Sequence, residues 1–208
     1  MLLRVLGLIG AVVLLLSGCA ASGGIDVRKY IFYLHGSVEE QEGITDKYTS
    51  AIAAIARRGV KVVSEVRLET EPTIYADKIR NQVVDLMGKG VSPGDITISG
   101  YSKGAVIALA ASAAIGNADV NYVLLAGCSE FLNRKYGVDP TRAVGRILSI
   151  YDLGDSRFAS CKNTFTEEQQ VTFREIALDS GKGHRLFRIP KEKFIEQWRD
   201  PLWQWAGV

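Results

Sequence analysis

The pentapeptide Gly100-Tyr101-Ser102-Lys103-Gly104 stands between an apolar run, 95–99, and an alanine-rich run, 105–111. The first run predicts a strand and the second a helix. A tight Gly-x-Ser-x-Gly turn between such elements strains the backbone of its central serine and exposes the hydroxyl at the top of a sheet. Side chains on its two glycines would collide with the neighbouring strand and helix. The segment therefore predicts a nucleophile, Ser102, which needs a base because a serine hydroxyl alone reacts poorly.

Strands and helices alternate along the rest of the chain. Mostly apolar stretches predict strands at 29–34, 60–66, 95–99, 120–126, 146–151 and 171–178. Amphipathic patterns predict helices at 46–58, 73–87, 102–115 and 190–205. This order implies an α/β fold with a mostly parallel sheet of about six strands and helices on both faces. Ligands of such sheets bind beyond the carboxyl ends of the strands, so we expect the partners of Ser102 there.

The chain has 208 residues, of which 47% are hydrophobic, and a formal net charge of +2. This size fits one folded domain, which we place at 27–208. The balanced charge gives no indication of nucleic acid binding. No glycine-rich phosphate-binding motif follows a strand, so we expect no nucleotide cofactor. We also expect no metal, because no second histidine or close cysteine pair accompanies His35.

The first residues have the organisation of an export signal. A positively charged start precedes a short apolar stretch, 5–16, and then Ser17-Gly18-Cys19. The apolar stretch is shorter than the about 20 residues that span a bilayer. The small residues before the cysteine resemble the lipobox of bacterial lipoproteins, which implies cleavage before Cys19 and its acylation. We therefore expect 1–18 to be a signal peptide, and 19–26 to be a lipidated cysteine with a flexible tether.

This interpretation carries an expected location at the bacterial cell envelope. A lipid anchor would hold the protein to a membrane on its periplasmic face. Ala20 follows the cysteine, and in lipoproteins of bacteria with two membranes a residue other than aspartate there implies transfer to the outer membrane. The alternative is an uncleaved anchor helix in which the cysteine occurs by chance.

The candidates for a base and for an acid lie after predicted strands. His35-Gly36 stands at the carboxyl end of the first strand, and His184 lies in a glycine-containing loop after the last one. That loop is free enough to bring an imidazole back over the sheet. Two acids, Asp152 and Asp155, follow the strand at 146–151. A serine, a histidine and an acid gathered at one edge of a sheet would make the serine nucleophilic.

These residues resemble the α/β-hydrolase superfamily in its Ser…Asp…His order. The resemblance extends over 29–205 and implies that Ser102 attacks an acyl carbonyl while His184 transfers its proton. An aspartate would orient His184. The pair His35-Gly36 resembles the His-Gly element of that family's oxyanion loop. It implies an oxyanion hole made by the backbone N–H groups of Ser37 and Lys103.

Several roles around this site stay open in the sequence. The turn Leu153-Gly154 favours Asp155 as the acid; Asp152 is the alternative, and could instead cap the loop through backbone hydrogen bonds. His35 is more consistent with a structural role than with catalysis. We expect the side chain of Lys103 in solvent, and we interpret Glu39-Glu40 as part of a charged surface loop or helix start.

The proposed fold makes two further predictions. Cys128 and Cys161 each follow a predicted strand, those strands are neighbours, and disulfides persist in exported proteins. We therefore predict a disulfide between them, the alternative being two buried free thiols. The stretch 128–145 has room for one short helix, where many relatives insert a cap domain. An uncapped site suits small esters, or a bulky substrate reached from outside.

The first functional hypothesis is a serine hydrolase of esterase or acyl-hydrolase type, tethered at the cell envelope. Its substrate would be a small-molecule ester or an ester of the envelope. A thioesterase, peptidase or acyltransferase would use the same triad. The other hypothesis is a non-catalytic lipoprotein on a hydrolase scaffold that binds an envelope component or a partner, since a fold alone does not establish activity.

Overall fold

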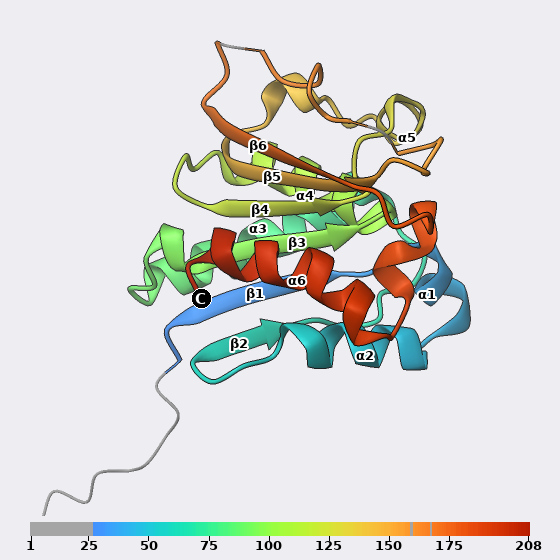
Figure 1. Cartoon of the computed structure of the whole chain (residues 1–208). Helices are drawn as coiled ribbons and strands as arrows, with labels where there is room; N and C mark the ends of the chain where they lie inside the picture. Colours follow the sequence, from blue (N-terminus) through green and yellow to red (C-terminus); the bar gives the residue numbers. More distant parts are fainter. Residues whose placement is uncertain (1–26, 159, 167) are drawn as a thin grey trace, which may run out of the picture.

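The computed structural model describes residues 27–208 apart from 159 and 167, so the predicted signal peptide, Cys19 and the tether lie outside the described residues. The chain forms a sheet with the strand order β2-β1-β3-β4-β5-β6, shown in Figure 1. All neighbouring strands are parallel. The strands are β1 (Lys29–Leu34), β2 (Val60–Val63), β3 (Ile96–Tyr101), β4 (Asn121–Leu125), β5 (Gly145–Asp152) and β6 (Val171–Leu178). The predicted α/β fold with about six strands is confirmed.

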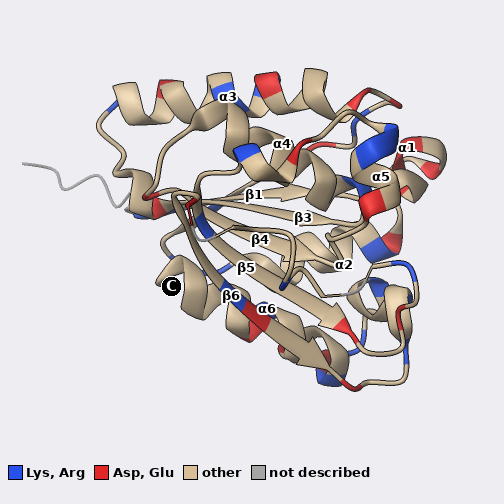
Figure 2. Cartoon of the chain, turned by 90° about the horizontal axis from the view of Figure 1, so that it is seen from above, with Lys and Arg blue, Asp and Glu red and all other residues tan. Residues whose placement is uncertain are grey.

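Helices cover both faces of the sheet. The α-helices are α1 (Ser37–Glu42), α2 (Asp46–Ile55), α3 (Pro72–Gly88), α4 (Lys103–Ile115), α5 (Glu130–Lys135) and α6 (Glu192–Ala206). The described residues also form short 3-10 helices, η1 (Pro93–Asp95), η2 (Pro140–Arg142) and η3 (Gly183–Arg188). Figure 2 shows α3 and α4 on one side of the sheet and α6 on the other, and α2 packs with α6.

The core has two layers, one on each face of the sheet. Along β1, Phe32 and Leu34 pack with residues of α3 and α4, whereas Ile31 and Tyr33 pack with residues of α2 and α6. Successive side chains of a strand point to opposite faces, so a strand covered on both sides needs a continuous apolar run. This is the physical reason that the strands could be recognised in the sequence.

Some predicted boundaries differ from the structure. The second helix ends at Ile55 instead of residue 58, because Ala56 already has extended backbone angles, φ −66° and ψ 131°. The second strand ends at Val63 instead of residue 66. For the stretch around Glu39-Glu40 the sequence leaves a charged surface loop or a helix start open, and the structure has a helix there, α1.

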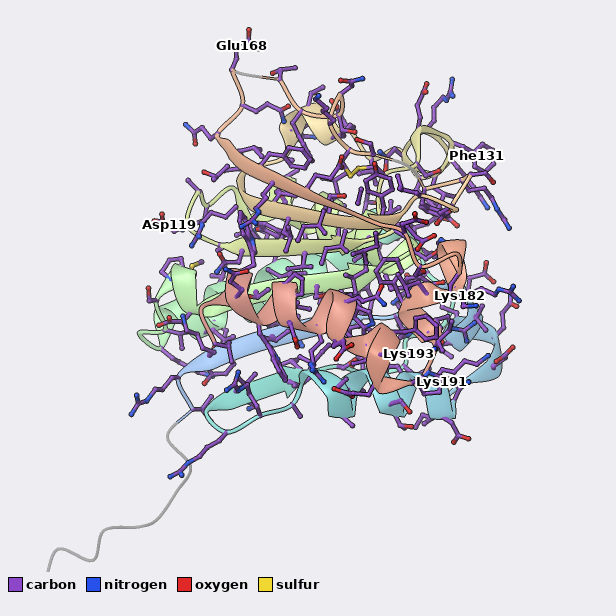
Figure 3. The ribbon with its side chains drawn as sticks, viewed as in Figure 1. Asp119, Phe131, Glu168, Lys182, Lys191 and Lys193 are labelled. Carbon is purple, nitrogen blue, oxygen red and sulfur yellow. A yellow bond between two sulfur atoms is a disulfide. The ribbon has the colours of Figure 1, made fainter. Side chains whose placement is uncertain are left out.

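The carboxyl ends of the strands lie at one end of the molecule. Figure 3 shows Phe131 and Lys182 at that end and Asp119 at the opposite one, and the chain's last residues also lie at the opposite end (Figure 1). Between β4 and β5 the chain forms only α5 and η2, so the predicted absence of a cap domain holds for this segment. Within the described part of the chain, no helix has the length and apolar character needed to cross a membrane.

Candidate active site

The turn between β3 and α4 strains the backbone at one residue. Ser102 has φ 56° and ψ −120°, a conformation that residues with a side chain rarely adopt. Its N–H donates to the carbonyl of Leu125 at 3.0 Å. A Cβ on Gly100 would lie 2.1 Å from the carbonyl oxygen of Gly104, and a Cβ on Gly104 would lie 2.0 Å from that of Leu34. Only glycine therefore fits on either side of Ser102 in this turn.

Hydrogen bonds connect Ser102, His184 and Asp155 in a chain. The Ser102 Oγ lies 3.0 Å from His184 Nε2. On the other side of the ring, His184 Nδ1 lies 2.7 Å from Asp155 Oδ2. The other carboxylate oxygen of Asp155 accepts the backbone N–H groups of Arg157, at 3.0 Å, and Phe158, at 3.2 Å. A serine hydroxyl, an imidazole and a carboxylate therefore lie within hydrogen-bond reach of one another, which is the geometry that a nucleophile with its base requires.

Asp152, the last residue of β5, has a different set of partners. Its Oδ1 accepts the N–H groups of Gly154 at 3.0 Å and Gly183 at 2.9 Å. Its Oδ2 accepts the N–H of Ser180 at 3.0 Å and the Ser180 hydroxyl at 2.5 Å. Burial by itself raises the pKa of this carboxyl. The hydrogen bonds lower the pKa by more than burial raises it, so the pKa of Asp152 lies below its usual range. Asp152 caps the two loops that carry Asp155 and His184.

Two aromatic rings enclose the imidazole of His184. Phe158 stacks on it, and Tyr101 lies with its ring centroid 5.0 Å from that of the imidazole. The Tyr101 hydroxyl donates to the backbone carbonyl of His184 at 3.0 Å. Burial, and the positive charges of Arg157 and Arg188, lower the pKa of His184 more than its contact with Asp155 raises it. The imidazole is therefore held neutral at neutral pH, which is the state a general base requires.

A cavity of about 590 Å³ opens over Ser102 and His184. Ser37, the first residue of α1, lines the same cavity. Lys103 is the first residue of α4 and directly follows Ser102. The first N–H group of a helix has no acceptor within that helix. The two residues predicted to donate to an oxyanion therefore both occupy the first turn of a helix beside the nucleophile.

His35, two residues before the first residue of α1, is 1% exposed. Its Nδ1 donates to the Gly36 carbonyl at 2.7 Å, and its Nε2 accepts the N–H of Arg67 at 2.9 Å. Burial, followed by the charge of Arg67, lowers the pKa of His35 to about 4. A Cβ on Gly36 would lie 3.2 Å from the Tyr101 ring and 3.5 Å from the Ser102 Cβ. His35 is therefore a neutral residue inside the turn before α1, consistent with the structural role expected for it.

The expectation that the Lys103 side chain lies in solvent is wrong, and Glu40 lies at a helix start, one of its two interpretations, but not at the surface. The Glu40 and Lys103 side chains are both 3% exposed, and Lys103 Nζ donates to Glu40 Oε2 at 2.8 Å. The second carboxylate oxygen accepts Arg67 Nε at 2.7 Å, and the Arg67 side chain is 2% exposed. Burying charges is costly unless they are paired and hydrogen-bonded, and tertiary packing supplies both requirements here.

The neighbouring Glu39 also lies in the first turn of α1, so the helix-start interpretation holds, but its side chain is buried, contrary to the surface-loop alternative. Its Oε1 lies 2.9 Å from Nη2 of Arg188, the last residue of η3. Since η3 also contains His184, this ion pair joins α1 to the segment that carries the imidazole. The sequence does not indicate this burial, because two adjacent acids at a helix start are usually exposed.

A disulfide joins Cys128 to Cys161, as the sequence predicts, with the Cα atoms 5.3 Å apart. Cys128 follows β4, whereas Cys161 follows the loop that contains Asp155 and Phe158. The Ser149 hydroxyl lies 3.1 Å from the Cys161 sulfur. The bridge therefore ties the acid-bearing loop to the end of a central strand.

The fold is the α/β-hydrolase fold, which solved serine hydrolases share. Esterase B from Lactobacillus rhamnosis, in a structure with a tributyrin phosphonate, has a TM-score of 0.62 and 13% identity, over 88% of this chain and 76% of that one. XC6422 from Xanthomonas campestris, described as an α/β serine hydrolase without a lid, has a TM-score of 0.56 and 15% identity, over 89% and 84%.

A thioesterase has the same fold. The RedJ thioesterase of Streptomyces coelicolor has a TM-score of 0.54 and 9% identity, over 84% of this chain and 90% of that one. No protein-family model and no curated protein matched the sequence. Identities this low show a common fold, so the chemistry has to be argued from the site itself.

Proposed function

We propose that this protein is a serine hydrolase that cleaves acyl esters through an acyl-enzyme. The observation that carries the proposal is the hydrogen-bonded chain from Ser102 through His184 to Asp155. A strained serine at the carboxyl edge of a parallel sheet, already in contact with a neutral imidazole, has no evident structural purpose there. It is the arrangement that a nucleophile requires.

The reaction would proceed in two halves. In the first, Ser102 Oγ attacks the acyl carbonyl while His184 Nε2 takes its proton, and the same proton then goes to the leaving alcohol. In the second half, His184 removes a proton from water, and the resulting attack releases the acid and regenerates Ser102. Asp155 keeps the Nδ1 proton of His184 directed toward itself, which fixes the tautomer and stabilises the imidazolium.

The negative charge that develops on the carbonyl oxygen would be bound by the backbone N–H groups of Ser37 and Lys103. Removing one such donor costs roughly 100- to 1,000-fold in rate in comparable enzymes. The amino end of α4 adds favourable electrostatic potential at the same place, because helix N–H groups point toward it.

The shape of the site favours an ester substrate with a short acyl group and a larger, polar second group. Apolar side chains in the 590 Å³ cavity, Leu132, Phe158 and the largely exposed Phe131, could contact a short acyl chain. An adjoining cavity of about 720 Å³ shares Ser129, Glu130 and Arg157 with it. Among the residues that the structure describes, none forms a cap over these cavities, so a substrate bulkier than either one can reach Ser102. A thioester would fit the same geometry.

The test is labelling with a fluorophosphonate probe, followed by turnover of p-nitrophenyl esters of increasing chain length. We expect the wild type to label at Ser102 and to prefer short chains, whereas Ser102→Ala and His184→Ala lose turnover while keeping the circular dichroism of the wild type. Ser92→Ala, outside the site, serves as the control. A folded wild type that neither labels nor turns over any ester would support the non-catalytic alternative.

We also propose that Cys19 carries a lipid that anchors the enzyme at the cell envelope. The support is the order of charged, apolar and small residues before it. Expression of the full chain in bacteria should give membrane-bound protein whose mass corresponds to cleavage before Cys19 plus acyl chains. Cys19→Ser should remove both the acylation and the cleavage, and an unmodified, uncleaved wild type would contradict the anchor.

A further inference from the structure

We propose that Glu40 is a positioning residue that sets the geometry of the oxyanion hole by binding two buried cations at once. The inference rests on the proposed function, because it concerns the same site. Glu40 would act through the backbone donors Ser37 and Lys103, and it would touch no reacting atom.

The bonds of Glu40 connect the segments that supply the two donors. Glu40 belongs to the helix that begins at Ser37 and lies one turn further along it. Its Oε2 accepts the ammonium of Lys103 at 2.8 Å. Lys103, whose backbone N–H is one proposed donor, is therefore bound through its side chain to α1, which carries the other donor at Ser37. This ion pair connects the two segments that form the proposed oxyanion hole.

Arg67 extends the same connection to the residues that precede α1. Its Nε donates to Glu40 Oε1 at 2.7 Å, and its Nη2 donates to the His35 carbonyl at 2.5 Å. Its backbone N–H donates to the His35 ring. The chain segment from His35 to Ser37 is consequently held at both ends, by Arg67 at its start and by Glu40 through α1 at its end.

Burial makes this arrangement depend on charge. The side chains of Glu40, Lys103 and Arg67 are each 2% to 3% exposed, so water screens their interactions little. A single carboxylate neutralises part of the repulsion between two cations. Without the charge of Glu40, Lys103 and Arg67 would lose the carboxylate that both of them bind, and we expect α1 to move relative to Lys103.

The kinetic consequence should fall on the transition state. The donors at Ser37 and Lys103 bind the oxygen only when it becomes negative, so a shift between them weakens transition-state binding more than substrate binding. A misplacement of about 1 Å in a catalytic group can cost up to roughly 100-fold in rate. A purely structural ion pair would instead change the amount of folded protein and leave turnover per folded molecule unchanged.

The test compares Glu40→Gln with Glu42→Gln, an exposed acid of the same helix. Rates are divided by the number of sites that the fluorophosphonate labels at completion, which removes any unfolded fraction. We expect Glu40→Gln to lower kcat about 10- to 100-fold with KM changed less than about threefold. Glu42→Gln should match the wild type. Equal kcat per labelled site in both variants would overturn the proposal.

Variants of Lys103 provide the second readout. Lys103→Met keeps the backbone donor but removes the cation, and Lys103→Arg keeps the charge. We expect Lys103→Met to lower kcat, Lys103→Arg to restore most of it, and Glu40→Gln combined with Lys103→Met to lose no more than the worse single variant. Multiplicative losses in the double variant would overturn the proposal. Should Glu40→Gln fail to fold, the comparison of Lys103→Met with Lys103→Arg decides alone, and their equality would contradict it.

The same data separate this inference from the proposed function. If the wild type neither labels nor turns over ester, the proposed function fails before any variant is measured. If the wild type is active and the Glu40 and Lys103 variants behave like it, only the positioning role fails.

Discussion

The phenyl ring of Phe158 stacks on the imidazole of His184, with the ring centroids 4.3 Å apart and the planes inclined by 19°. Phe158 is buried, and its backbone N–H also donates to the carboxylate that contacts the other edge of the imidazole. The residue therefore removes water from one face of His184 and simultaneously holds Asp155. Burial is the largest cause of the lowered pKa of His184.

Phe158→Leu tests the effect of this stacking. The smaller side chain admits water to the imidazole but keeps the backbone donor, so the pKa of His184 should rise toward its usual 6.5. In the proposed mechanism the neutral imidazole is the base, so the acid limb of kcat/KM in the wild type should lie below pH 6.5 and move to higher pH in the variant. Phe173→Leu is the control, because Phe173 is a partly buried residue of β6. An unmoved acid limb would contradict this account.

Arg157→Gln should move the same limb in the same direction through charge alone. The Arg157 guanidinium disfavours the protonated imidazole and so lowers the pKa of His184. Arg157 is exposed, and solvent screens it, so we expect a small upward shift that shrinks as salt is added. Arg58→Gln is the control, because Arg58 is also exposed and lines neither the Ser102 cavity nor the adjoining one. Identical pH profiles for Arg157→Gln and the wild type would refute the prediction.

Asp155→Asn and Asp152→Asn should separate the orientation of His184 from the stability of the fold. Losing the carboxylate that holds a catalytic histidine costs up to roughly 10,000-fold in kcat, so Asp155→Asn should be nearly inactive although folded. Asp152→Asn leaves two of the four donors around that side chain poorly matched. It should lower the free energy of unfolding by about 2–4 kcal/mol while reducing turnover per labelled site far less. Urea unfolding and site-normalised kcat measure the two effects, and a reversed pattern would exchange the two roles.

His35→Gln should alter how stability depends on pH. The pKa of His35 is lowered from 6.5 to about 4 in the folded protein. Between these values the unfolded chain binds a proton that the folded protein excludes, so this contribution is complete above pH 6.5 and is lost as the pH falls toward 4. At about 1.4 kcal/mol for each pKa unit, the loss amounts to roughly 3 kcal/mol. Gln can still accept the Arg67 N–H, so the variant should fold.

Urea titrations between pH 7.5 and 4.5 measure this effect. The wild type should lose stability steadily below pH 6.5, and His35→Gln should lose less over the same interval. Part of the dependence remains in the variant, because the pKa of His184 is also lowered. The same pH dependence in both proteins would show that His35 is not the group responsible.

Which of the two candidate acids contacts His184 depends on residues distant in the sequence. Asp152 and Asp155 follow the same strand, and a short turn separates them. The turn favoured Asp155, but the direction of each carboxylate depends on the loop around Ser180 and Gly183, which comes about thirty residues later. The structure directs Asp155 to His184 and Asp152 to that loop.

Local sequence patterns are enough to specify the strands and the serine turn: apolar runs long enough for strands covered on both faces, and glycines spaced so that a serine turn fits between a strand and a helix. The environment of the charges depends instead on tertiary packing. Glu40 and Lys103 are 63 residues apart in the chain, and each alone looks like an ordinary surface residue. Their burial became possible when folding brought a carboxylate and two cations together away from water. Such pairing is a property of packing between distant segments, and no local sequence pattern encodes it.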